Sequence, residues 1–109
     1  MPFIADAVYE AAVAVLAKSD GLHVASREVS NASELEQSSL GMSPVRMVRS
    51  GRGLTVLPIR GGIVTAPGKA THWVLVASGQ VLASSFLSES KTLGLGNAFD
   101  LDSFDIAFP

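Results

Sequence analysis

Positions 4 to 18 carry alanine and other apolar residues, few charges and neither glycine nor proline, a pattern that predicts a helix. Pro2 precedes this stretch and Gly21 follows it, as is typical of the two ends of a helix. On a helical wheel the apolar positions fall on two sides, which together span about 200°, twice the arc that a helix needs to lie on one sheet. The first side holds Ile4, Val8, Ala11 and Val15, and the second holds Tyr9, Val13 and Leu16.

Two explanations are open for the second side of this helix. Either loops of the same chain cover it, or it meets a neighbouring copy, because a wide exposed apolar face is a liability on a small monomer. The second explanation makes Tyr9, Val13 and Leu16 the residues of self-association.

After position 21 the pattern changes to short apolar or alternating runs separated by glycines, which predicts strands and turns. These runs are 22–26, 45–49, 54–57 and 63–66. Positions 31–40 predict a brief polar helix or loop, in which Ser33 and Glu36 have the spacing of a capping box.

The clearest strand pattern lies in the second half of the chain. Runs 71–77 and 80–87 flank Ser78 and Gly79, which predicts a tight hairpin. Both faces of 71–77 are mostly apolar, so this run should be a central strand. A last strand is expected at 104–108, and because Phe99 and Leu101 have the opposite phase, the chain needs a break near 102–103.

These elements predict a mainly β fold in one domain that spans 1–109, a usual length for a single domain. The expected architecture is an antiparallel β-sandwich or barrel of six to seven short strands, at about 22–109, with an N-terminal α-helix at about 4–18.

Composition narrows the class of protein. An apolar share of 48% with 17% charged residues is that of a folded chain, and a net charge of −2 gives no field that attracts nucleic acid or anionic lipid. The lack of cysteine excludes disulfides and thiolate metal sites. Because Asp6 and Glu10 interrupt the short first apolar stretch, we expect no signal peptide, no transmembrane segment, no membrane partner and a protein that is cytoplasmic when made.

Candidate catalytic and metal-binding residues are few. His72 could combine with a serine and with Asp100, Asp102 or Asp105, but no nucleophile-elbow motif accompanies them, and His23 has no second histidine nearby. The three aspartates lack the glycine and glutamate of an EF-hand loop. We therefore expect no catalytic residue, no metal and no cofactor, and a protein that is not an enzyme.

The chain has one concentration of basic residues. Guanidinium groups bind carboxylates or phosphates, but no aromatic residues are interleaved here for stacking on bases, so a partner protein is favoured over nucleic acid. The residues of this predicted partner site are Arg46, Arg49, Arg52 and Arg60.

The order of segments provides a further indication. An alanine-rich opening helix is followed by runs 22–28, 51–56, 62–66, 70–76 and 104–106 before the terminal Pro109, and Ala-Thr-His-Trp at 70–73 is the most distinctive stretch. Over nearly its whole length the chain resembles a group of small uncharacterised proteins encoded in the structural-gene clusters of tailed bacteriophages and prophages. Pro67 and Lys69 depart from the Gly- and Thr-rich run of that group. The resemblance implies a structural role and no reaction.

The expected function is therefore a non-enzymatic structural or decoration-type component of a phage or prophage particle, which becomes virion-associated after assembly. Its expected partners are copies of itself, as a homo-oligomer, and other virion or structural proteins. The alternative is a carbohydrate- or ligand-binding β-sandwich module for host recognition or a fibre tip. Such a module needs an exposed aromatic platform, for which Trp73 and Tyr9 are the candidates.

Overall fold

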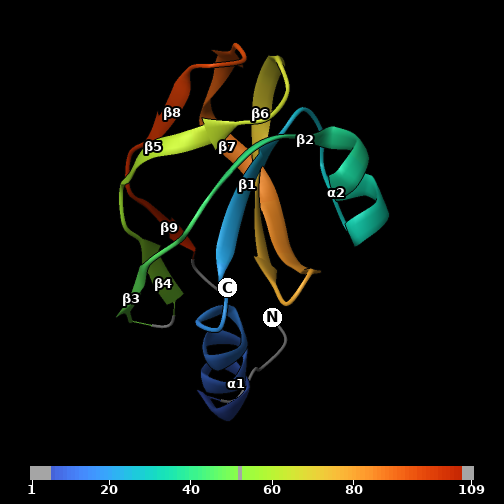
Figure 1. Cartoon of the computed structure of the whole chain (residues 1–109). Coiled ribbons are helices and arrows are strands. Elements are labelled where there is room, and N and C mark those ends of the chain that lie inside the picture. Colours follow the sequence, from blue (N-terminus) through green and yellow to red (C-terminus); the bar gives the residue numbers. More distant parts are fainter. Residues whose placement is uncertain (1–5, 52, 107–109) are drawn as a thin grey trace.

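The computed structural model describes residues 6–51 and 53–106, which fold into two helices and nine strands (Figure 1). In chain order the elements are α1 (Asp6–Leu16), β1 (Gly21–Ala25), α2 (Ala32–Ser38), β2 (Ser39–Ser43), β3 (Met47–Ser50), β4 (Gly53–Val56), β5 (Ile59–Val64), β6 (Gly68–Ala77), β7 (Gln80–Leu93), β8 (Ala98–Leu101) and β9 (Phe104–Ile106).

The strands form two antiparallel sheets. Six of them pair in the order β7-β6-β1-β2-β5-β8, and the other three in the order β3-β4-β9. The larger sheet curls into a half-barrel, and α1 lies at one end of the molecule beside the smaller sheet (Figure 1). A mainly β, antiparallel fold with an N-terminal helix is thus confirmed, although the described residues contain more strands than the six or seven expected.

β6 is the inner strand that the sequence predicts. It pairs with β1 on one side and β7 on the other, and residues 72–76 are all buried. The hairpin between β6 and β7 turns at Ser78 and Gly79, whose φ angles of 50° and 78° are both left-handed. Such a pair of positive φ angles is typical of the tight turns that match strand twist.

The expected break after Leu101 is a change of sheet. β8 ends there and pairs with β5, whereas β9 begins at Phe104 and pairs with β4 of the smaller sheet. The change of side-chain phase between Leu101 and Phe104 therefore marks the point where the chain leaves one sheet for the other.

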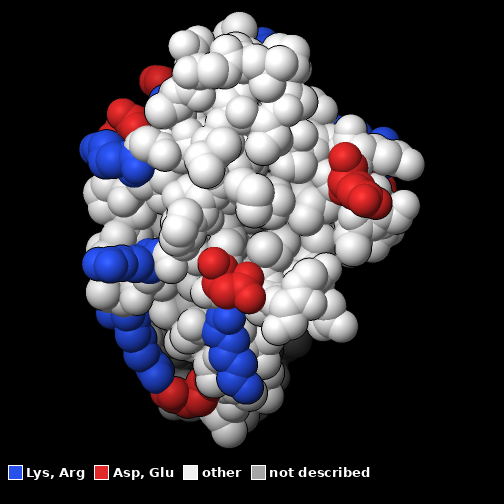
Figure 2. All heavy atoms as spheres, in the orientation of Figure 1, with Lys and Arg blue, Asp and Glu red and all other residues white. Residues whose placement is uncertain are grey.

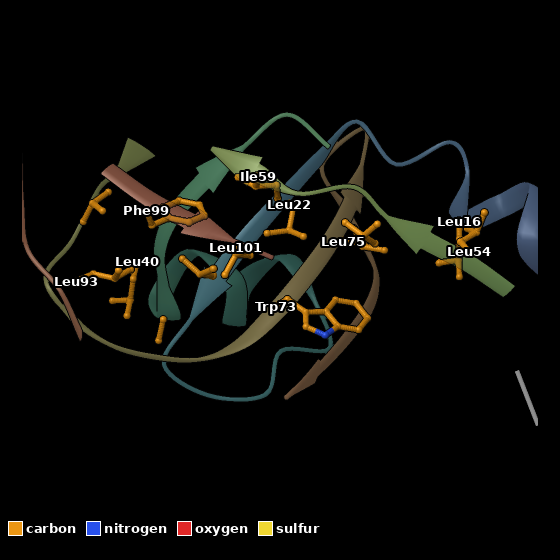
Figure 3. Packing of buried hydrophobic residues seen from close by; sticks show 14 of the residues in the cluster. Leu16, Leu22, Leu40, Leu54, Ile59, Trp73, Leu75, Leu93, Phe99 and Leu101 are labelled. Atoms are coloured by element: carbon orange, nitrogen blue, oxygen red, sulfur yellow. The ribbon is translucent and has the colours of Figure 1, made fainter. Parts of the chain in front are cut away.

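The core lies inside the curl of the large sheet and continues to the small sheet and α1. Its largest fully buried side chains include Leu22, Leu75 and Val56. Figure 3 shows Leu16 of α1 beside Leu54 of β4 at one end of this cluster. Both α1 and the small sheet are thereby joined to the half-barrel through one continuous apolar core.

A second, smaller cluster lies on the outer face of the sheet. Val29 and Leu35, from the segment that includes α2, cover Ala25, Val74 and Val76. α2 begins at the cap residue Asn31, whose Oδ1 accepts a hydrogen bond from the Glu34 N–H at 2.9 Å. The predicted capping box at Ser33 and Glu36 is therefore wrong by two positions.

Candidate functional site

The side of α1 for which two explanations were open, with Tyr9, Val13 and Leu16, faces the core of the same chain, so the self-association predicted for these residues is wrong. Their side chains lie on the inner side of the helix, and Tyr9, Val13 and Leu16 are 7%, 5% and 7% exposed within the single chain. Val8 and Val15 remain 57% and 49% exposed. The two apolar sides exist as predicted, and the side with Val8 and Val15 is the exposed one.

The uncovered side of α1 carries few charges. Val8, Ala11 and Val15 are all exposed, and their spacing places them on one stripe of the helix. Glu10 accepts two hydrogen bonds from the guanidinium of Arg49 on β3, one of them at 2.5 Å from Nη1 to Oε2, and these bonds lower the pKa of Glu10. We call Val8, Ala11 and Val15 the helix stripe; Ile4 lies outside the described residues.

Two of the arginines predicted as a partner site, Arg49 and Arg60, lie on different sheets. Arg49 is bound to Glu10, and Arg60 on β5 donates to the backbone oxygens of Ile59 and Leu101 and lies 3.5 Å from Asp102. Arg46 is exposed and makes no ion pair with a described residue; Arg52 lies outside the described residues. In Figure 2 the basic groups of this face are separated by uncharged atoms and several have acidic neighbours.

A hollow of about 390 Å³ lies between β7 on one side and the end of β8 with β9 on the other. We call it the seam groove, because it lies where β7 and β8, the two edge strands of the large sheet, come near each other. Its lining residues are Trp73, Ser85, Phe86, Leu87, Ser88, Glu89, Lys91, Leu101, Asp102, Phe104 and Asp105.

The seam groove results from an irregularity in β7 and from the change of sheet after β8. His72 pairs with Phe86 and Ala70 pairs with Lys91, so residues 87–90 stand opposite Thr71 alone. Such a bulge takes β7 out of its regular register and turns its side chains in new directions. The rings of Trp73 and Phe104 pack 5.1 Å apart between centroids, which gives the groove an aromatic lining.

The ionisable residues of the groove are mostly acidic. Glu89, Asp102 and Asp105 are carboxylates, and Lys91 is the single cation among the lining residues. Asp105 accepts a hydrogen bond from Thr55 at 2.7 Å, and the side chain of Asp102 is 98% exposed. The arrangement suits neutral or cationic ligands better than anions.

The two histidines both contact hydroxyl groups. His72 is buried, lies 2.8 Å from Thr71 Oγ1 and packs on the Phe86 ring. His23 Nδ1 lies 2.8 Å from Ser39 Oγ, and partial burial lowers the pKa of its imidazole. No sequence pattern predicts the pair of His23 and Ser39, because its members are 16 positions apart and belong to different elements.

His23 and Ser39 do not form a complete catalytic set. Glu36 lines the same shallow hollow but makes no hydrogen bond to His23, so among the described residues no acid orients the imidazole. Ser39 also stands at the C-cap of α2, where the helix dipole opposes a developing oxyanion. The pair instead ties the end of α2 to β1.

Residues 6–51 and 53–106 contain neither a cluster of metal ligands nor a membrane-spanning helix. No three His, Asp or Glu side chains come together there as ligands for a metal ion. Neither helix in this part of the chain has the length and apolar character needed to span a membrane.

The chain was compared with protein-family models, with curated proteins and with solved structures, and none of them matches it.

Proposed function

We propose that this protein is a non-enzymatic structural component that associates with copies of itself through α1. The observation that carries the proposal is the helix stripe, since Val8 and Val15 are about half exposed on a helix whose other side already fills the core. Exposed apolar side chains that gather on one helix face mark a contact surface on a small protein.

The stripe is complementary to itself. When two antiparallel helices meet across a two-fold axis near Ala11, Val8 of one copy faces Val15 of the other, and the small side chain at the centre lets the helices approach closely. Glu10 does not oppose this contact, because Arg49 of the same chain neutralises its charge. Association by apolar burial then needs no bound cofactor.

The setting that we propose is a phage or prophage particle, in which the protein acts as a structural or decoration-type component and contacts other virion proteins. The support for this setting is the order of segments along the sequence, which resembles that of small proteins from the structural-gene clusters of tailed phages and prophages. A self-associating module without a catalytic set is the kind of protein that such particles use.

Light scattering across a range of protein concentrations tests the self-association. The wild type should have a mass above one chain, and Val15→Glu should reduce it to one chain by placing a charge in the stripe. Leu95→Glu is the matched control, since Leu95 is 63% exposed in the turn between β7 and β8 and should leave the mass unchanged. A wild-type mass of one chain at every concentration would refute the proposal.

The seam groove favours a second candidate, a ligand-binding module for glycans. The expected platform residues Trp73 and Tyr9 are each only 7% exposed, so an open stacking surface on them is excluded. Trp73 does line the groove, and it is the single tryptophan of the chain, so its fluorescence reports on this site. Quenching by oligosaccharides would support the glycan candidate, and unchanged emission would remove it.

A further inference from the structure

We infer that the seam groove binds an extended, basic segment of another protein. This inference goes beyond self-association, because it concerns a different surface and a different partner. Three properties of the groove support this inference: the unpaired strand edges that border it, the indole N–H of Trp73 and the excess of carboxylates.

The groove is bordered by β7 and β8, the two edge strands of a sheet that does not close into a barrel. Among the described strands, β7 pairs only with β6 and β8 pairs only with β5, so each leaves one side of its backbone without a strand partner. Unpaired strand edges are places where an extended chain from another protein can lie and form main-chain hydrogen bonds. A segment in the groove would lie along the edge of β7 and reach Leu101 at the end of β8.

Trp73 provides a hydrogen-bond donor for that segment. The residue is 7% exposed and lines the groove, yet its indole N–H donates to no described residue. In the described chain the one buried side-chain polar atom that is sealed from solvent without a hydrogen-bond partner is Ser84 Oγ, so the indole nitrogen of Trp73 is not sealed in this way. A buried indole normally has an acceptor. A main-chain carbonyl oxygen of a bound segment would fill this role.

The carboxylates determine the charge of the partner. Glu89 of β7 faces the groove from one side, and Asp102 and Asp105 face it from the other. Arg60 stands 3.5 Å from Asp102 and Lys91 is the sole lining cation, so three carboxylates meet fewer positive charges than they can bind. Lysine or arginine side chains on the segment would supply the missing charge and could also lie on the aromatic lining.

Fluorescence anisotropy with a dye-labelled peptide of alternating lysine and valine tests the inference, with the emission of Trp73 recorded in parallel. The background is Val15→Glu, so that the test does not depend on self-association. The peptide should bind and change the emission, and added salt should weaken it. Glu89→Gln with Asp102→Asn should reduce the affinity about tenfold or more.

The matched control is Glu28→Gln with Glu36→Gln. It also removes two negative charges, but from exposed positions outside the groove lining. It should leave the affinity within about twofold, since distant exposed charges are screened. The inference fails if the control weakens binding as much as the groove variant, or if a glutamate-valine peptide binds equally well. It also fails if binding leaves the emission of Trp73 unchanged, or if only oligosaccharides alter it.

Discussion

The ring of Phe99 packs closely against two residues that have no side chain. It stands opposite Gly62 on β5, and a Cβ built on Gly62 would fall inside the van der Waals radius of the ring. A Cβ on Gly41 of β2 would lie 2.9 Å from the same ring and 2.7 Å from the Ile63 oxygen. Neither glycine has a left-handed φ, so the requirement at both positions is for space.

Gly62→Ala should therefore destabilise the protein by about 1–3 kcal/mol, the usual cost of overpacking a core. Urea unfolding measures the change. Gly21→Ala is the control, because a Cβ there would make an ordinary 3.4 Å contact with Val76. It should leave the free energy of unfolding nearly unchanged, and an equal loss in both variants would show that the Phe99 ring is not the cause.

His23 should make stability depend on pH. Burial lowers its pKa from the ordinary value of 6.5, so the folded state disfavours the charged imidazole. The contribution of His23 is fully present above pH 6.5, declines as the pH falls from there towards the lowered pKa, and is lost below it. In His23→Gln the free energy of unfolding should fall less across this range, and parallel pH profiles for the two proteins would contradict the prediction.

Among the elements, α2 is held at its start by a local network. Asn31 Oδ1 accepts from the Glu34 N–H, and Glu34 Oε1 accepts from the backbone N–H of Ser30 at 3.1 Å and from its hydroxyl at 2.6 Å. These bonds from Ser30, with the charge of Arg27 a smaller cause, lower the pKa of Glu34. The carboxylate is thus favoured in its charged form where it caps the helix.

Asn31→Ala should cost about 1 kcal/mol, because the first turn of α2 loses its side-chain acceptor. Thermal unfolding monitored by circular dichroism measures this loss. Ser33→Ala should be nearly neutral, since the helix does not begin at Ser33. The reverse order of effects would restore the cap that the sequence pattern suggested.

Alternation and turn residues predicted most of the elements. The β6–β7 hairpin, the inner position of β6 and the break after β8 all follow from local patterns. β2 was missed because Gly41 resembles the end of a helix, whereas this glycine makes room for a ring from β8. Which side of α1 is buried could not be predicted either, since both sides are apolar and only the docking on β4 distinguishes them.

The candidate site was harder to predict than the fold. Trp73 was singled out as an aromatic, but its pairing with Phe104 joins residues from different sheets. The groove also depends on the bulge at 87–90, which leaves no mark in the alternation because the whole stretch stays in strand β7. The ion pairs of the predicted arginine site could not be foreseen, because the carboxylates that pair with Arg49 and Arg60 are distant in sequence.

At the scale of the whole molecule, the two sides of α1 should have different effects when a charge is introduced. Val13 is 5% exposed and belongs to the core that joins the helix to both sheets. A charge at this position should unfold the chain, whereas a charge at Val15 should leave the chain folded and remove only its association. The stability of the assembled protein then contains a term that depends on its concentration.

The thermal midpoint should therefore rise with protein concentration. For a dimer, each tenfold increase adds about 1.4 kcal/mol to the free energy of unfolding, or roughly 2–4 °C for two chains of this size. In Val15→Glu the midpoint should not depend on concentration, and in Leu95→Glu the dependence should be that of the wild type. Calorimetry at several concentrations measures this. A wild-type midpoint that stays constant would mean that the helix stripe faces solvent in the native protein, since only an interface that is lost on unfolding couples stability to concentration.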